Sequence, residues 1–262
     1  MPFCWRSSAR REPDPPTPST DGRVVYAVGD IHGCAELLSA LLRAIARDAA
    51  DLAPAQPPVL VFIGDYVDRG DDSRGVIDQV IALQGGAFEV RALKGNHEEM
   101  LLAFLQDAGA GPTWAQFGGL KTLASYGVAP PAMRSQGEAW EAARQALGAA
   151  LPAGHRAFLA NLELWASFGD HVFVHAGVRS GTPIERQRER DLLWIRDAFL
   201  RSKAPFPAIV VHGHTPQDEP TLGPRRIGID TGAYATGVLT AVRLQGAERK
   251  VIQARAGALK RT

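Results

Sequence analysis

The fold class of this chain follows from one segment, Val59-Leu60-Val61-Phe62-Ile63-Gly64-Asp65-Tyr66-Val67-Asp68-Arg69-Gly70. Its first five residues are all apolar, which predicts a short strand buried on both faces. The strand stops at Gly64, where a residue without a side chain permits a tight turn. Asp65 then follows at the carboxyl end of the strand, which is where open α/β sheets bind their ligands. The segment therefore predicts a functional carboxylate at the edge of a sheet.

The same arrangement recurs on both sides of this segment. Short apolar runs again end at polar residues bordered by glycine, and helical periodicity fills the intervals between the first runs. Strands are expected at 24–28, 59–63, 88–93, 172–174, 209–211 and 226–229, and helices at 34–50, 76–83 and 98–106. Strands that alternate with helices in this way predict an α/β domain.

The remaining segments define the domain organisation. Residues 1–22 are expected to be disordered, because 7–22 holds four prolines and one weakly apolar residue and cannot bury enough surface to fold. Residues 23–255 are expected to form a single domain. Within it, 109–169 is rich in helix formers and predicts a helical insertion packed over the sheet or beside the cleft. Its tryptophans are interpreted as packing residues, any one of which could line the cleft: Trp114, Trp140 and Trp165.

Composition excludes several classes of function. Lys plus Arg number 29 against 28 Asp plus Glu, and this net charge of +1 argues against nucleic-acid binding or polybasic membrane binding. The two cysteines, Cys4 and Cys34, are too few for a disulfide framework. No apolar run approaches the roughly 18 residues of a membrane span, and the first 22 residues carry charges and prolines where a signal peptide would be apolar. We therefore expect a cytoplasmic protein.

Five segments place polar side chains at the expected strand ends, bordered by glycine. They are Gly29-Asp30-Ile31-His32-Gly33, Gly64 to Gly70, Gly95-Asn96-His97-Glu98, His175-Ala176-Gly177 and His212-Gly213-His214-Thr215-Pro216. Each segment alone is typical of an ordinary turn or a helix cap. Together they supply carboxylate, amide and imidazole donors, a set that suits manganese, iron or zinc and fits calcium poorly. Five such strand ends are expected to converge on one site.

On these motifs, taken in this order, the chain resembles the phosphoprotein phosphatase family. These are the metal-dependent serine/threonine protein phosphatases, including bacterial ones, of the calcineurin-like metallophosphoesterase superfamily. The resemblance runs from about Arg23 to Thr240. It implies a sandwich of central β-sheets flanked by helices (αββα). It also implies two divalent metal ions that share the Asp65 carboxylate, the first ion held with Asp30 and His32, the second with Asn96, His175 and His214.

The resemblance implies further roles around the metal pair. Two ions about 3.5 to 4 Å apart lower the pKa of a bridging water, so that a metal-bridging hydroxide attacks phosphorus directly. His97 is the expected general acid for the leaving alkoxide, with Asp68 as its orienting partner. Arg69 and Arg196 resemble the family's phosphate-binding arginines. For Arg196, the plain alternative is a surface residue of the charged stretch 185–201.

Three neighbouring features are interpreted as structural. Asp230-Thr231-Gly232 follows an expected strand and is typical of a turn. Glu98 is expected to support the site through a hydrogen bond or to cap the following helix. Cys34 is not a cysteine-phosphatase nucleophile, because the Cys-x5-Arg loop would need arginine where Ala40 stands.

The sequence thus predicts a metal-dependent phosphomonoesterase, a serine/threonine protein phosphatase acting on a phosphoprotein or phosphopeptide with manganese, iron or zinc. Pro216 favours this branch, because other branches carry one more histidine ligand there. The alternative is a bis(5′-nucleosyl)-tetraphosphatase, since the same site would serve a phosphoanhydride. A third hypothesis is a catalytically silent member that binds a partner through the aromatic insertion, against which the complete ligand set weighs. Neither nucleic acid nor a membrane is an expected partner.

Overall fold

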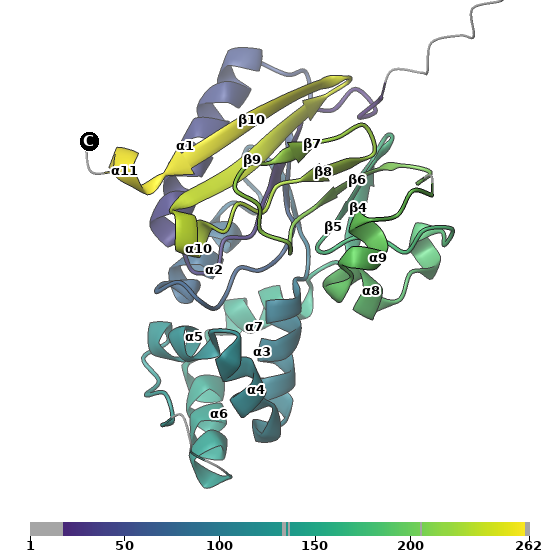
Figure 1. Cartoon of the computed structure of the whole chain (residues 1–262). Coiled ribbons are helices and arrows are strands. Elements are labelled where there is room, and N and C mark those ends of the chain that lie inside the picture. The colour runs from purple at the N-terminus through teal and green to yellow at the C-terminus, as the bar shows by residue number, and fades with distance from the viewer. Residues whose placement is uncertain (1–17, 133–134, 136, 205, 260–262) are drawn as a thin grey trace, which may run out of the picture.

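Two five-stranded β-sheets face each other in the computed structural model, which describes residues 18–132, 135, 137–204 and 206–259 (Figure 1). The first sheet has the strand order β10-β9-β1-β2-β3, and the second has the order β4-β5-β6-β8-β7. Helices cover the outer face of each sheet. The predicted αββα sandwich is therefore confirmed.

The first sheet is built around three parallel strands, β1 (Val25–Val28), β2 (Val59–Phe62) and β3 (Glu89–Ala92). Their carboxyl ends consequently lie at the same edge. β9 (Val238–Gln245) runs antiparallel beside β1 and forms a hairpin with β10 (Glu248–Arg255). This hairpin is not among the predicted strands, because polar residues such as Arg243 interrupt its apolar pattern.

The second sheet is likewise built around three parallel strands. β5 (His171–Val174), β6 (Ile209–His212) and β8 (Arg226–Gly228) are parallel, so their carboxyl ends also share an edge. β4 (Trp165–Phe168) and β7 (Thr221–Leu222) are antiparallel edge strands.

Alternation along the strands divides the apolar residues between two cores. In β1, Val25 and Ala27 belong to the core between the sheets, whereas Tyr26 and Val28 belong to the core beneath the helices. Phe173 of β5 meets the first set from the opposite sheet. Both faces of each central strand are therefore covered, which explains why these strands consist of continuous apolar runs.

The flanking helices follow from apolar periodicity. α1 (Ala35–Leu52) buries Leu37, Leu38, Leu41 and Ile45 against the first sheet, together with α2 (Ser73–Ala82). The second sheet is covered by the segment containing η2 (Ile184–Arg186), α8 (Glu189–Trp194) and α9 (Asp197–Leu200). Short helices α10 (Ala233–Thr236) and α11 (Ala256–Leu259) flank the C-terminal hairpin. Among the helices of the described residues, none combines the length and the apolar character that a bilayer span requires.

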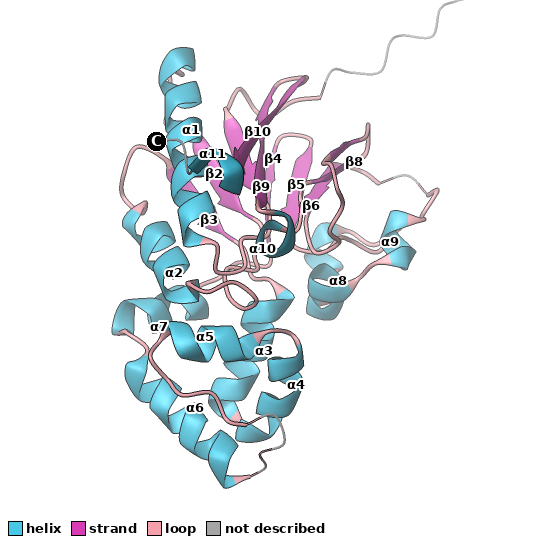
Figure 2. Cartoon of the chain, turned by 60° about the vertical axis from the view of Figure 1, so that its left-hand side comes forward, coloured by secondary structure: helices cyan, strands magenta, loops and turns pink. Residues whose placement is uncertain are grey.

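The helical insertion lies below the sandwich in Figure 2. It follows α3 (Asn96–Gln106) and comprises η1 (Ala108–Ala110), α4 (Gly111–Gln116), α5 (Gly119–Ser125), α6 (Glu138–Ala150) and α7 (Ala153–Ala160). The predicted range 109–169 extends too far at its end, because Trp165–Phe168 forms strand β4. Ala166 and Phe168 are buried there while Ser167 is exposed, which is the two-residue period of a strand.

Part of the segment that the sequence predicts to be disordered is ordered. Of the expected disordered segment 1–22, residues 1–17 lie outside the described residues. Ser19 is tied to the second sheet, since its N–H donates to Asp170 Oδ2 at 2.8 Å and its carbonyl accepts from Asp170 N at 3.0 Å. Thr20 is buried and donates to Arg23 O at 2.6 Å. Disorder up to residue 22 is therefore wrong for 19–22, because backbone hydrogen bonds can hold a segment that buries little apolar surface.

Candidate active site

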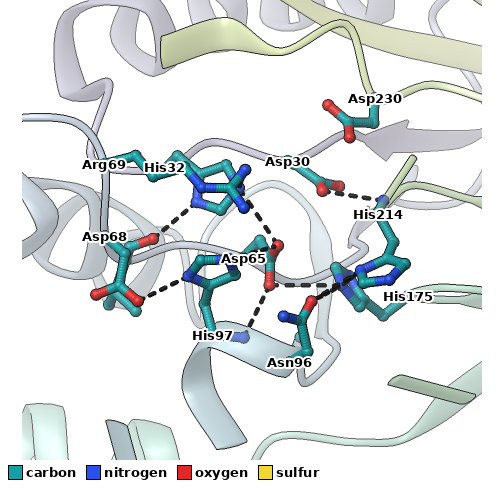
Figure 3. Close-up of polar contacts among 12 residues, drawn as sticks. Asp30, His32, Asp65, Asp68, Arg69, Asn96, His97, His175, His214 and Asp230 are labelled. Carbon is teal, nitrogen blue, oxygen red and sulfur yellow. Dashed lines mark hydrogen bonds and ion pairs between the residues drawn. The ribbon is translucent and has the colours of Figure 1, made fainter. Parts of the chain in front are cut away.

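Five parallel strand ends deliver polar side chains to one edge of the sandwich, where these side chains gather (Figure 3). Asp30, Asp65 and Asn96 follow β1, β2 and β3 of the first sheet. Opposite them, His175 and His214 follow β5 and β6 of the second sheet. All five side chains are at most 5% exposed. The edge of the sandwich therefore holds a dense, buried cluster of metal-ligating groups.

Asp65 lies at the centre of this cluster. Its Oδ2 is 3.3 Å from His32 Nε2, and its Oδ1 is 3.4 Å from His175 Nε2. The carboxylate therefore presents one oxygen to each side of the site.

On one side of Asp65, four donor atoms approach one another closely. Asn96 Oδ1 is 2.8 Å from His175 Nε2 and 2.8 Å from His214 Nδ1, and the two ring nitrogens are 3.2 Å apart. His175 Nδ1 is 2.9 Å from the carbonyl oxygen of Ile63, so in the neutral ring the proton sits on Nδ1. The lone pair of Nε2 then points at other electron-rich atoms. A cation bound beside His175 Nε2, Asn96 Oδ1 and Asp65 Oδ1 would satisfy these three atoms.

The donor atoms on the other side of Asp65 are arranged in a similar way. His32 Nδ1 donates to Val67 O at 2.9 Å, which leaves the Nε2 lone pair facing Asp65 Oδ2. Asp30 Oδ2 accepts from His214 N at 3.0 Å, whereas Asp30 Oδ1 is buried without a hydrogen-bond partner. Gly213 lets the chain pass this carboxylate, because a Cβ there would lie 2.0 Å from Asp30 Oδ1.

Burial keeps the imidazoles in the form that binds metal. It lowers the pKa of His32 to about 3 and that of His214 to about 2, and it also lowers the pKa of His175. The neutral rings of His32 and His175, with their Nε2 lone pairs turned toward carboxylate and amide oxygens, fit a pair of divalent cations. Two His/Asp groups able to hold a metal share Asp65, one with His32 and His97, the other with His175 and His214.

His97 differs from the other histidines of the cluster. Its Nδ1 is 2.7 Å from Asp68 Oδ2, and its Nε2 is buried, has no hydrogen-bond partner and lies 3.9 Å from Asp65 Oδ2. Burial alone would lower the pKa of His97, but the carboxylates of Asp65 and Asp68 outweigh it and raise the pKa. The ring is oriented by Asp68 and presents Nε2 to the site.

Two arginines border the cluster at opposite ends. Arg69 Nη1 is 3.1 Å from His32 Nε2, and its guanidinium lies 4.8 Å from the ring centroid of Tyr234, a half-exposed side chain. Arg196 precedes α9, and its Nε donates to His214 Nε2 at 3.1 Å. The structure therefore places Arg196 at the site and not on an isolated surface stretch.

Glu98 holds the loop that carries Asp65. Its carboxylate accepts hydrogen bonds from the backbone N–H groups of Asp65, Tyr66, Val67 and Gly95 at 2.8 to 3.2 Å. It also caps α3, which begins at Asn96, two residues earlier than predicted. Both structural roles expected of Glu98 therefore occur together.

The loops around the cluster are conformationally strained. Non-glycine residues rarely adopt positive φ, and such residues gather at functional sites. Those found in this cluster are His32 (47°), Asp65 (54°), Asp68 (72°), Arg69 (67°) and His214 (64°).

Asp230 belongs to the cluster, although its segment reads as a turn in the sequence. It follows β8, is 3% exposed and lies beside Asp30 (Figure 3). Burial, with a contribution from Asp65, raises the pKa of Asp230 to about 6. The position after a sixth parallel strand was the feature of the sequence that could have identified it.

The structure brings together all ten residues that the sequence nominates: Asp30, His32, Asp65, Asp68, Arg69, Asn96, His97, His175, Arg196 and His214. Comparison with known proteins identifies the family. The sequence model of the calcineurin-like phosphoesterase family matches residues 23–243. The chain belongs to the calcineurin-like phosphoesterase family.

Relatives within this family carry two kinds of name. The chain is 30% identical over 231 residues to serine/threonine-protein phosphatase 1 of Salmonella typhimurium, covering 85% of this chain and 93% of the relative. It is also 30% identical over 241 residues to an asymmetrical bis(5′-nucleosyl)-tetraphosphatase of Bacillus velezensis, covering 82% and 87%. A solved structure provisionally assigned as a diadenosine tetraphosphatase shares the fold, with a TM-score of 0.63 and 22% identity over 92% of this chain and 98% of its own.

Proposed function

We propose that this metallophosphoesterase is a two-metal phosphoric monoester hydrolase, and specifically a serine/threonine protein phosphatase. One observation carries the proposal. His97 turns an unpartnered, buried Nε2 toward Asp65, and its other ring nitrogen is held by the Asp68 carboxylate. This is a proton donor placed beside the groups that would hold the metals.

The donor set divides into two metal sites that share Asp65. Asp30, His32 and Asp65 Oδ2 would hold one cation, and Asp65 Oδ1, Asn96, His175 and His214 the other. Manganese is the proposed metal, with iron or zinc as further candidates for these mixed donors. When bound, the cations would polarise the phosphoryl oxygens and lower the pKa of a water between them.

The side chains around these sites supply the remaining chemistry. Arg69 and Arg196 present planar guanidinium groups from the His32 end and the His214 end, and each suits two oxygens of a phosphoryl group. His97 Nε2 donates its proton to the departing oxygen of the substrate. Asp68 keeps the ring oriented and stabilises its charge.

The nature of the leaving group favours a monoester. A serine or threonine alkoxide leaves poorly unless it is protonated, so a dedicated acid accelerates its departure by about 10²- to 10⁴-fold. A nucleotide leaving from a phosphoanhydride is a far weaker base and gains less from a proton. The pairing of His97 with Asp68 therefore supports a phosphoserine or phosphothreonine substrate.

The second candidate is a bis(5′-nucleosyl)-tetraphosphatase. It is favoured by the relatives and the solved structure that bear this name. The same metal ligands and arginines would serve a phosphoanhydride, so the two functions differ in substrate and not in site.

Relative turnover tests the two candidates directly. The purified full chain, loaded with manganese, is offered a phosphoserine peptide and, separately, diadenosine tetraphosphate. We expect the larger kcat/KM for the phosphopeptide. A preference for the dinucleotide would replace the first proposal with the second, and no hydrolysis of either by folded, metal-loaded protein would favour a silent, partner-binding member.

We also propose a phosphoprotein or phosphopeptide as the partner and the cytoplasm as the place of action. Low net charge supports a partner other than nucleic acid or an anionic membrane. The low cysteine content supports a reducing compartment.

A further inference from the structure

The helical insertion contributes none of the proposed metal ligands, yet it contacts the acid pair, which consists of His97 and Asp68. The Asp68 carboxylate is fully buried and follows β2 on a strained loop. Besides His97, it accepts hydrogen bonds from two side chains of the insertion, Trp114 of α4 and Thr122 of α5.

Trp114 holds one oxygen of this carboxylate. Its indole Nε1 donates to Asp68 Oδ2 at 2.9 Å, the same oxygen that His97 Nδ1 contacts at 2.7 Å. The indole is 1% exposed and packs against Phe104, with ring centroids 4.9 Å apart. Packing therefore fixes the direction from which this donor approaches, and the donor carries no charge at any relevant pH.

Thr122 holds the other oxygen. Its hydroxyl donates to Asp68 Oδ1 at 2.6 Å and accepts from the backbone N–H of Asp68 at 2.9 Å. Ser73 Oγ lies 3.1 Å from Asp68 N and 3.1 Å from Thr122 Oγ1. A carboxylate can only accept, so the single hydroxyl proton of Thr122 is committed to Asp68. The plane of the carboxylate is thereby set from both of its oxygens.

The insertion also fixes the backbone beside this carboxylate. Arg69 N donates to Gly118 O at 3.3 Å, and Gly118 adopts φ of 103°. A Cβ on Gly118 would lie 2.7 Å from Arg69 N, so only glycine allows this close approach. The turn between α4 and α5 thus packs directly on the strained Asp68–Arg69 segment.

From these contacts we infer that Trp114 and Thr122 are positioning residues of the proposed phosphatase. They hold the Asp68 carboxylate so that the His97 ring aims Nε2 at the departing oxygen of the substrate. The inference rests on the proposed function for its catalytic consequence, while the geometry itself is independent of substrate. It gives the insertion a defined task, which is to support the acid from outside the sandwich.

Leaving groups of different basicity test this role. Thr122→Val keeps the shape of the side chain but removes the hydroxyl, and Trp114→Phe removes the indole N–H. We expect both variants to hydrolyse a phosphoserine peptide about 10-fold more slowly, because a misplaced acid serves a basic leaving group poorly. Hydrolysis of 2,4-dinitrophenyl phosphate should change less than about 2-fold, since dinitrophenolate leaves without a proton.

Matched variants separate positioning from general damage. Thr122→Ser restores the hydroxyl and should recover the rate. Trp140→Phe makes the same change in a second buried indole, which also contacts Phe104 but donates to Ser135 O, and should leave both substrates unaffected. An equal loss on both leaving groups in Thr122→Val and Trp114→Phe, or no loss on either, would overturn the inference.

A spectroscopic measurement keeps the inference separate from the proposed function. In metal-free protein labelled with ¹⁵N-histidine, the proton of a short His97 Nδ1–Asp68 hydrogen bond should resonate far downfield. We expect it to persist in Trp140→Phe and Thr122→Ser, and to shift or broaden in Thr122→Val and Trp114→Phe. An unchanged resonance in those two variants would overturn the inference. If it responds while the wild-type protein hydrolyses no phosphate ester, the proposed function fails and the positioning stands.

Discussion

The edge of the sandwich and the helical insertion contribute to the site in different ways. Every proposed metal ligand follows a parallel strand or begins the helix after one, and the connecting turns contain glycine. The insertion supplies no such ligand. Its helices instead reach the His97–Asp68 pair through Trp114 and Thr122. They attach to α2 through a chain of hydrogen bonds that runs from the buried Tyr126 and His155 to the exposed Asp78.

This difference shows two levels of support for one site. Strand ends fix where the donor atoms lie, because parallel strands in one sheet must end at the same edge. Helices packed against that edge fix the orientation of a side chain on a loop, in this case the Asp68 carboxylate. Substitutions of the proposed ligands at strand ends should therefore abolish metal binding, whereas substitutions in the insertion should change rates or stability and leave the metal in place.

Asp65→Asn should have the largest effect. Asp65 presents one oxygen to each group of donors, so its loss should remove metal and reduce turnover by more than about 10³-fold, equivalent to about 4 kcal/mol of barrier. Elemental analysis after dialysis, together with kcat, measures both effects. Asp51→Asn, an exposed substitution on α1, should retain metal and activity. Retention of two metals by Asp65→Asn would refute the bridging role.

His97→Asn should have a smaller effect, and this effect should be on kcat and not on metal content. The amide cannot donate the proton, so kcat should fall by about 10²- to 10³-fold while metal content stays at the wild-type level. If His97→Asn and Asp65→Asn lost metal equally, His97 would be a ligand of the first group and not an acid. This prediction matters because His97 lies geometrically within that group.

The two levels of support also explain what the sequence could predict. The strand ends could be predicted because an apolar run followed by glycine and a polar residue is a local pattern. Asp65, Asn96 and His175 were found in this way, and the α/β class of the domain followed from the same runs, whereas the sandwich was implied by the family resemblance. Asp230 shares that position, but Asp-Thr-Gly is equally typical of a turn, and only its place beside Asp30 distinguishes the two.

Support from the insertion could not be predicted in the same way. Trp114 and Asp68 are 46 residues apart, and no local pattern distinguishes an indole that packs from one that packs and donates to a carboxylate. Strand β9 was not predicted for a related reason, because it contains a buried arginine, Arg243. Such a residue becomes compatible with a strand only through a distant partner, in this case Asp48 on α1.

Asp48→Asn tests a buried charge that lies in the sandwich but away from the edge that holds the site. We expect this charge to contribute to the stability of the fold and not to turnover. Asp48 accepts from Tyr26 OH at 2.8 Å and Arg243 Nη1 at 3.2 Å, and it pairs with Lys250. Its removal leaves the buried guanidinium short of a partner, so the free energy of unfolding should fall by about 2 kcal/mol at pH 7. Urea denaturation measures this loss, with Asp51→Asn as the matched control. A fall in kcat would contradict the separation of the two regions.

The pH dependence of that loss has a defined sign. Burial alone would raise the pKa of Asp48, but hydrogen bonds from Lys250 and Tyr26 and the charge of Arg243 lower it below its usual value. A carboxyl group with a lowered pKa stabilises the fold above its unfolded pKa of about 3.9 and loses this contribution as pH falls through the folded value. The difference in stability between wild type and Asp48→Asn should be full at pH 7 and shrink below about pH 4.

Tyr126→Phe should have the smallest effect, at the attachment of the insertion. The Tyr126 hydroxyl is 2.8 Å from His155 Nδ1, and His155 Nε2 is 2.8 Å from Asp78 Oδ1 on α2. Removing the hydroxyl leaves one buried ring nitrogen unpaired, which should lower the free energy of unfolding by about 1 kcal/mol. Tyr234→Phe, on a half-exposed ring, should leave stability unchanged. Packing alone can hold α5 in place, so the kcat of Tyr126→Phe should stay within about 2-fold of the wild-type value. A larger fall in kcat would mean that the hydrogen bond from Thr122 to Asp68 depends on the attachment of the insertion to α2.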